Sequence, residues 1–355
     1  MTKANGAELS TCLAALVLLL PALLAAQEPD TAGRGLDSLE AALPRVRTAP
    51  GLNTPSRLPL ASGEYRKAPP RFEVLLQMRG EYIPGEPDVA TFFFRKVELG
   101  IKGQVAEHVA FSVELDPVRP DDPFRRTYIR LSYFEHVLLK LGLEKAPVGL
   151  AELTSSDEIP FVTRPEVSNR FAPAEELGVH LEAPWEHWLV QLSATNGNGR
   201  APRDDNRRKD LSARVVWGPL PWLSVGASTS QGAIGEVPRD RNRYNVEVKL
   251  GDNLTGLQVE GYRAKDASVW STASYVEAYR GIPIRANWLT HVQPAIRYER
   301  IDRRDDVADE ELSVLTLGLN LLFHGHAAKL QLNYLSELRT PGRADEWRAQ
   351  YQLAF

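Results

Sequence analysis

The chain closes on EWRAQYQLAF, residues 346–355, and this stretch indicates how the rest of it folds. Every second residue in it is apolar or aromatic: Trp347, Ala349, Tyr351, Leu353 and Phe355. A period of two residues predicts a β-strand with one apolar face and one polar face. Segments 109–116, 137–144 and 244–250 alternate in the same way. The sequence therefore predicts repeated two-faced strands over most of its 355 residues.

About sixteen such segments follow one another from residue 71 onward, each eight to thirteen residues long. This length suits a tilted strand that crosses a membrane better than a globular strand of about five or six residues. Segment 268–279 differs from the others because its apolar residues fall on both faces. The predicted strands are 72–82, 91–103, 108–116, 125–134, 137–145, 175–183, 188–195, 209–217, 222–230, 242–250, 254–264, 268–279, 291–301, 311–322, 327–337 and 345–355.

The connections between these strands alternate in length. Short ones, such as 251–253, alternate with mostly longer and charged ones, such as 146–174 and 196–208. Outer-membrane barrels have short periplasmic turns and long external loops in this order. The tract 280–290 departs from the rule as a long periplasmic turn. We therefore predict an all-β fold, a transmembrane antiparallel β-barrel of about 16 strands with both chain ends on the periplasmic side.

A soluble β-sandwich also has alternating strands, but it does not need aromatic residues at the strand ends. Here such residues gather near strand ends, as at Phe92–Phe94 and Trp217, which is typical of membrane-interface girdles. The mean hydropathy of −0.29 and a single long apolar run exclude a helical membrane bundle. The net charge of −4 argues against a nucleic-acid-binding protein. Cys12 is the single cysteine, which excludes a disulfide framework and a cysteine zinc site.

The N-terminal residues are typical of an exported protein. Lys3 precedes an apolar run, Leu13–Leu24, and small residues follow at Ala25 and Ala26. We predict a signal peptide over 1–26, with an uncleaved membrane anchor as the alternative. The proline-rich stretch 27–70 is predicted to be an irregular periplasmic lead-in, and 71–355 the barrel. The expected location is the outer membrane of a Gram-negative-type envelope.

The polar strand faces are expected to line the lumen, which is wide enough for a water channel at about sixteen strands. The two signs of charge nearly balance there, and most charges are expected to be solvated wall. The cations that we single out for an anion pathway are Lys96, Lys102, Arg130, Lys140 and Arg297.

Several motifs resemble the phosphate-selective porin O and P family. The stretch 94–103, FRKVELGIKG, is similar to the family's second-strand motif, and FSVELD follows at 111–116. LEKAPVGLAELTSS at 143–156 resembles the signature FKEPFGLEELTSS, and NGNG at 196–199 resembles a family loop. TLGLN at 316–320 is similar to part of the penultimate hairpin. In the signature, this chain departs from the family at Glu144, Ala146, Val148 and Ala151.

The resemblance implies a homotrimeric porin whose third long loop, 146–174, folds inward and narrows the barrel. Lys145, Arg164 and Arg170 are its cationic candidates, with hydroxyls at 154–156 as donors. Phosphate is bound by charge-assisted hydrogen bonds from such side chains. The alternative is that Lys145 only braces the root of the loop, while the arginines pair with Asp157, Glu158 or Glu166.

No nucleophile, metalloprotease or phosphate-loop motif is present, so we predict no enzyme, no metal and no cofactor. Basic residues in 200–209 are expected to be solvated, to attract anions, or to meet lipopolysaccharide phosphates. The acidic run 305–311 matches no calcium-loop spacing. We predict passive diffusion of small hydrophilic solutes, foremost anions such as phosphate or pyrophosphate. The alternatives are a general, weakly selective pore and a non-conducting structural or ligand-binding barrel. The expected partners are small anions and outer-membrane lipid.

Overall fold

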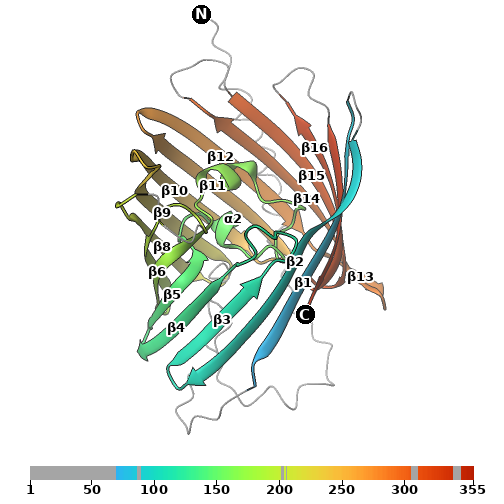
Figure 1. The fold of residues 1–355 in the computed structure, drawn as a ribbon. Coiled ribbons are helices and arrows are strands. Elements are labelled where there is room, and N and C mark those ends of the chain that lie inside the picture. The colour runs from blue at the N-terminus through green and yellow to red at the C-terminus, as the bar shows by residue number, and fades with distance from the viewer. Residues whose placement is uncertain (1–68, 86–88, 201–203, 205, 305–310, 339–344) are drawn as a thin grey trace, which may run out of the picture. The chain divides into compact units, whose positions relative to one another are not determined.

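The computed structural model describes residues 69–85, 89–200, 204, 206–304, 311–338 and 345–355. The predicted signal peptide and nearly all of the predicted lead-in lie outside the described residues. Over the described part, the chain forms one antiparallel sheet that closes on itself, because β1 pairs with both β2 and β17 (Figure 1). The elements are β1 (Arg71–Ile83), β2 (Val89–Ala106), β3 (Val109–Leu115), β4 (Thr127–Phe134), β5 (Val137–Lys145), α2 (Leu150–Leu153), α3 (Glu166–Phe171), β6 (Glu175–Pro184), β7 (Trp188–Thr195), β8 (Asp210–Leu220), β9 (Leu223–Ile234), β10 (Arg239–Gly251), β11 (Thr255–Asp266), β12 (Val269–Arg280), β13 (Ile282–Ala286), β14 (Leu289–Asp302), β15 (Glu311–His324), β16 (Ala328–Glu337) and β17 (Glu346–Ala354).

Sixteen of the seventeen described strands make the wall of the barrel. The exception is β13, which pairs only with the first residues of β14, whereas β12 pairs directly with β14 along Thr272–Tyr279. The small β13 hairpin therefore occupies the long turn predicted over 280–290. Each predicted strand has a counterpart in the wall, and the prediction of a closed antiparallel β-barrel is confirmed.

Side chains alternate between an apolar outer face and a polar inner face. On β11, Gln258 and Glu260 are buried while Val259 between them is 38% exposed. On β1, Arg79 and Gln77 are buried while Met78 between them is 48% exposed. In a closed sheet the period of two sends every second side chain into the lumen. The predicted assignment of polar faces to the lumen therefore holds on both strands.

The two rims of the barrel differ in their connections and both carry aromatic side chains. Most strands at one rim are joined by short turns, and most strands at the other by longer loops; we call these the short-turn rim and the long-loop rim. The exceptions are the β13 hairpin at the short-turn rim and the two-residue turn between β11 and β12 at the long-loop rim. Trp188 stacks on Trp217 at the short-turn rim, with ring centroids 5.9 Å apart. Tyr334 and Trp347 contact each other near the long-loop rim, with ring centroids 4.8 Å apart. These pairs have the positions of interfacial girdles.

The loop over residues 146–174 carries both described helices and packs on the inner face of the sheet. One buried apolar cluster joins this loop to inner-face residues of four strands. The loop contributes Val148 just before α2, Ala151 in α2, and Val167 and Phe171 in α3. These wall residues are Tyr262, Ala264, Ala273, Tyr275, Ile301 and Leu312. The cluster explains why segment 268–279 has apolar residues on both faces: one meets the exterior and the other meets this loop. Among the described residues, no helix is long and apolar enough to cross a lipid bilayer.

Candidate functional site

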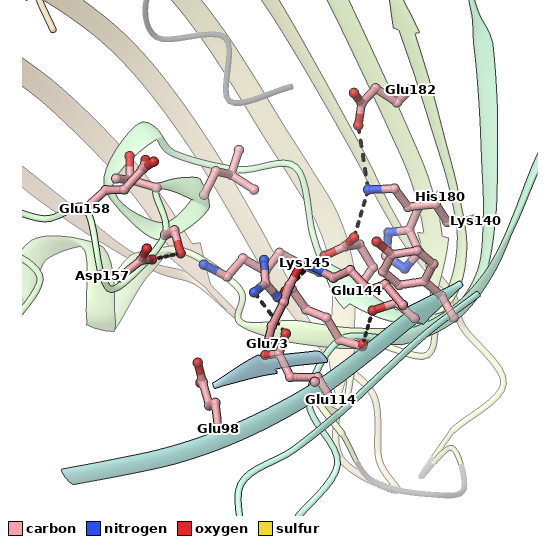
Figure 2. Close-up of a pocket in the computed structure, with 18 of the residues that line it drawn as sticks. Glu73, Glu98, Glu114, Lys140, Glu144, Lys145, Asp157, Glu158, His180 and Glu182 are labelled. Atoms are coloured by element: carbon pink, nitrogen blue, oxygen red, sulfur yellow. Dashed lines mark hydrogen bonds and ion pairs between the residues drawn. The ribbon is translucent and has the colours of Figure 1, made fainter. Parts of the chain in front are cut away.

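A cavity with a volume of about 560 Å³ lies between the 146–174 loop and one side of the wall. Residues of β1 to β8 line the cavity, and we call the part made by β3 to β8 the open wall. The opposite side, β11, β12 and β14 to β17, holds the loop, and we call it the packed wall. The side chains labelled in Figure 2 line the cavity, and all of them are ionisable.

Lys140 is the central cation of the open wall. Its ammonium group lies 2.8 Å from Glu144 and 3.7 Å from Glu182, and 5.1 Å from the ring centroid of Tyr128. Residues 140 and 144 point inward from the same strand, and Glu182 lies on the paired strand β6. The ammonium group of Lys140 thus lies between two carboxylates (Figure 2). These three side chains together carry no excess of positive charge.

Lys145 and Arg164 brace the root of the 146–174 loop. Lys145 donates to the carbonyl oxygen of Glu152 and lies 3.8 Å from its carboxylate. Arg164 donates to the carbonyls of Ala151 at 2.9 Å and Thr154 at 2.7 Å, and lies 3.6 Å from Glu152. Lys145 therefore has the contacts of a residue that braces the root of the loop, as the alternative interpretation expected. Arg164 pairs with Glu152, and not with Asp157, Glu158 or Glu166 as that interpretation expected.

The remaining predicted cations are spread around the lumen and do not form one site. Arg170 pairs with Glu166 at 2.7 Å, and Lys102 with Glu73 at 2.5 Å. The side chain of Arg130 has no ion pair or hydrogen bond with another described residue, and only its backbone pairs, within the sheet. The other two also have partners: Lys96 bonds Glu98 and the Ser156 hydroxyl, and Arg297 lies 2.9 Å from Glu299 and donates to the carbonyl of Thr163.

The hydroxyls predicted as donors at 154–156 have partners within the protein. Thr154 donates to the carbonyl of Leu150 at 2.8 Å, which closes the end of α2. Ser155 donates to Asp157, and Ser156 accepts from Lys96. In the same loop, burial and then the neighbouring charge of Asp157 raise the pKa of Glu158. Among the described residues, no group of three or more His, Cys, Asp or Glu side chains could hold a metal ion.

Glu260 anchors the loop to the packed wall, and the sequence analysis did not single it out for this role. Its fully buried carboxylate accepts from the backbone N–H groups of Leu150 at 2.6 Å and Ala151 at 2.9 Å. The hydroxyl of Tyr275 donates to the same carboxylate at 2.6 Å. On β14, Glu299 accepts from the N–H of Val167 at 3.2 Å. Two wall carboxylates therefore satisfy the first N–H groups of both loop helices.

Polar side chains of the packed wall hold the middle of the loop, residues 157–163. Lys329 donates to the carbonyls of Asp157 at 2.8 Å and Ile159 at 2.9 Å. Asn320 donates to the carbonyl of Pro160, and Asn333 accepts from the N–H of Val162, both at 2.7 Å. The loop backbone is thus bonded to side chains from β15 and β16, which leaves it little freedom to move.

Arg200, one of the basic residues predicted in 200–209, forms a cationic group with Arg119 and Arg125, which the sequence analysis did not single out. The pKa of Arg119 is lowered by burial and by the charges of Arg125 and Arg200 nearby. Asp116 lies 3.7 Å from Arg119 and 3.5 Å from Arg125, and Glu175 lies 3.2 Å from Arg200. The group therefore has carboxylates interleaved with its guanidinium groups. In the sequence, this group could have been recognised from the several arginines in the loops at 116–126 and 196–208.

Comparison with known proteins places this geometry among porins. The model of the family described as phosphate-selective porin O and P matches residues 80–268, more than half of the chain. No curated protein matches the chain at a significant level.

Three solved structures show the same fold. OmpF of Salmonella typhi in complex with daunomycin has a TM-score of 0.62 at 10% identity, over 81% of this chain and 97% of that chain. The trimer form of in-vitro folded OmpT of Vibrio cholerae has a TM-score of 0.58 at 12% identity, over 81% of this chain and 99% of that chain. The high-pH structure of OprB of Pseudomonas putida has a TM-score of 0.57 at 10% identity, over 81% of this chain and 94% of that chain. At these identities the likeness concerns the fold alone.

Proposed function

The chain belongs to the phosphate-selective porin O and P family and is an outer-membrane porin, and we propose that it lets small hydrophilic solutes diffuse passively through the cavity beside the 146–174 loop. The observation that carries this proposal is the cavity of about 560 Å³, lined by ionisable side chains from the open wall. Such a lining keeps the passage hydrated and offers weak, repeated contacts to a solute. Family and fold point to a channel rather than an enzyme.

In this proposal, the 146–174 loop sets the width of the passage. The bonds from Glu260, Glu299 and Lys329 to the loop backbone support a fixed constriction. The apolar cluster beneath α2 and α3 supports the same role, because it fills the packed side of the lumen. Solutes then pass between the loop and the open wall.

The pairing of charges supports weak selectivity. Among the described residues that line the cavity, five cationic side chains face seven acidic ones, with His180 in addition. Lys140, Lys145 and Lys102 all lie within ion-pair distance of a carboxylate. An anion-selective level needs an excess of one sign at a narrow point. A general pore for small hydrophilic solutes fits this lining best.

Selective passage of phosphate is the second candidate, and the arginines near the long-loop rim favour it. Arg119 and Arg125 share Asp116, at 3.7 and 3.5 Å, and Arg125 and Arg200 share Glu175, at 3.8 and 3.2 Å. Guanidinium groups bind phosphate oxygens by paired, charge-assisted hydrogen bonds. A passing phosphate would have to compete with Asp116 and Glu175 for these donors.

Reversal potentials of the purified protein in a planar bilayer test both candidates. A general pore gives a small reversal potential in a potassium chloride gradient, and millimolar phosphate leaves the chloride current unchanged. A phosphate-selective pore gives a clear anion preference and a chloride current that phosphate blocks. Absence of any conductance would overturn the proposal in both forms and would favour a structural barrel.

Two further assignments belong to this proposal. Residues 1–26 are removed as a signal peptide, which N-terminal sequencing of the protein purified from outer membranes would establish by a start near Gln27. The barrel assembles as a homotrimer, which is supported by family membership and by the fold shared with an OmpT described as a trimer form. Native mass spectrometry in mild detergent would contradict this by showing a single chain.

A further inference from the structure

Two cations project from the outer face of the barrel near the long-loop rim. Arg263 and Lys265 lie at the end of β11, beside Trp270 of β12. The guanidinium carbon of Arg263 lies 4.6 Å from the centroid of the Trp270 ring, and the ammonium nitrogen of Lys265 lies 5.6 Å from it. Tyr244 of β10 stacks on the same indole at 6.4 Å. Two positive charges and two aromatic rings thus form one outer patch.

The alternation of β11 sets the direction of these side chains. Tyr262 and Ala264 are buried on the inner face, at 3% and 1% exposure, where they pack on the 146–174 loop. Arg263 and Lys265 have the opposite parity and share the outer face with Val259. In the strand register, Arg263 lies opposite Tyr244 and Lys265 lies opposite Trp270. The four residues of the patch are therefore cross-strand neighbours on the outside of the barrel.

No carboxylate of the described structure pairs with either cation. Two acidic residues at this end of β10 and β11 pair with other cations: Asp266 with Arg243 at 2.9 Å and Asp240 with Arg208 at 2.8 Å. A third outward cation at this rim, Arg300 on β14, has Glu311 at 2.5 Å. Arg263 and Lys265 thus leave positive charge on a surface that otherwise meets membrane lipid.

We propose that Arg263, Lys265 and Trp270 bind the phosphate-bearing headgroup of a lipid in the outer leaflet of the outer membrane. The long loops of such barrels face outward, so this rim lies at the outer leaflet. Outward cations are unfavourable at the middle of the bilayer but nearly neutral at its interface, where aromatic girdles lie. Basic residues at this level bind anionic headgroups, and the indole holds both cations by cation–π contact.

The occupant is a lipid and not free phosphate, because the patch continues into an apolar surface. Val246 and Val259 lie below it on the same outer face and are 62% and 38% exposed. Acyl chains of a lipid can cover these side chains while its phosphate meets Arg263 and Lys265. A free ion would gain only the two charges, at a site open to water and screened by salt.

The test measures binding of lipid A to the purified, detergent-solubilised barrel by native mass spectrometry, after divalent cations are chelated. We expect the double variant Arg263→Gln with Lys265→Gln to bind lipid A about tenfold more weakly than the unmodified protein. Dephosphorylated lipid A should bind the unmodified protein about as weakly, with no further loss in the variant. Each single variant should show an intermediate loss, which covers the case in which the double variant does not insert.

The matched control removes two exposed arginines at the opposite rim, Arg280→Gln with Arg285→Gln. It should bind lipid A as the unmodified protein does. Both double variants should keep the unmodified conductance, because Arg263, Lys265 and Arg280 have the outward parity of their strands and Arg285 is exposed on the β13 hairpin. Equal lipid binding by the Arg263 and Lys265 variant, or an equal loss in the control, would overturn the proposal. Full displacement of lipid A by millimolar inorganic phosphate would show a free-anion site instead and would also overturn it.

Discussion

The packed wall and the open wall of this barrel carry the same kinds of inward charged side chains, but these side chains have different partners on the two walls. On the packed wall, Glu260 and Lys329 bond to the backbone of the 146–174 loop and are fully buried. On the open wall, Lys140 and Glu144 pair with each other beside a cavity of about 560 Å³. The comparison shows that inward charges serve two purposes in one lumen. One set fixes the loop in place, and the other lines the passage.

The largest expected effect is the loss of the loop anchor on the packed wall. Glu260→Ala removes the acceptor of Leu150, Ala151 and Tyr275, so these buried donors lose their partner. We expect the free energy of unfolding in detergent to fall by about 3 kcal/mol. Single-channel conductance should rise about twofold as the constriction loosens.

The control for this variant is Glu135→Ala, which removes a carboxylate from a turn at the short-turn rim, where its side chain is 86% exposed. It should change neither quantity. Unchanged conductance in Glu260→Ala would show that this carboxylate does not hold a constriction.

Lys329 and Lys140 compare the two walls with one type of side chain. Lys329→Met leaves the carbonyls of Asp157 and Ile159 without their donor and should lower the free energy of unfolding by about 2 kcal/mol. Lys140→Met leaves carboxylates that water in the cavity can solvate, so it should cost less than about 1 kcal/mol. Urea unfolding followed by tryptophan fluorescence measures both, and equal costs would contradict the division into two walls.

The packed wall is also expected to weaken in acid through His326, in the turn between β15 and β16. Burial and the charge of Lys329 lower the pKa of His326 from 6.5 to about 4, so the fold holds the neutral ring. The unfolded chain takes up the proton first as pH falls. The stabilisation is therefore complete above pH 6.5 and is lost as pH falls toward 4.

His326→Gln tests this linkage. Between pH 7 and pH 4, the unmodified protein should lose about 2 kcal/mol more unfolding free energy than the variant. Urea titrations at both pH values measure the difference. An identical loss in the two proteins would place the acid sensitivity elsewhere.

The smallest expected effect lies on the open wall and concerns ion selectivity. Lys140→Gln removes the cation between Glu144 and Glu182 and leaves the acidic excess of the cavity larger. The ratio of potassium to chloride permeability should rise by about twofold, with conductance nearly unchanged. Reversal potentials in a salt gradient measure this ratio, and the matched change Arg280→Gln should leave it unaltered because that side chain is exposed and has the outward parity of β12.

The alternation of residues such as Met78 between Gln77 and Arg79 was sufficient to predict the barrel, its strands and its two faces. This succeeded because a closed sheet in lipid must pair every backbone group and must send alternate side chains to opposite solvents. The two apolar faces of segment 268–279 were a visible sign of the loop beneath it, but alone they could not be told from an irregular strand. The sequence predicted the lumen cations as residue types and could not tell which of them were already engaged.

What the tertiary structure decided is the use of each inward charge. Glu260 and Glu144 are both glutamates that point inward from their strands. Glu260 nevertheless caps α2, whereas Glu144 lines the cavity. The difference depends on where the 146–174 loop lies, and a loop bonded to strands more than a hundred residues away has no local pattern that announces its contacts. Strand parity is a local property of the chain, whereas the partner of an inward side chain is set by long-range closure of the barrel.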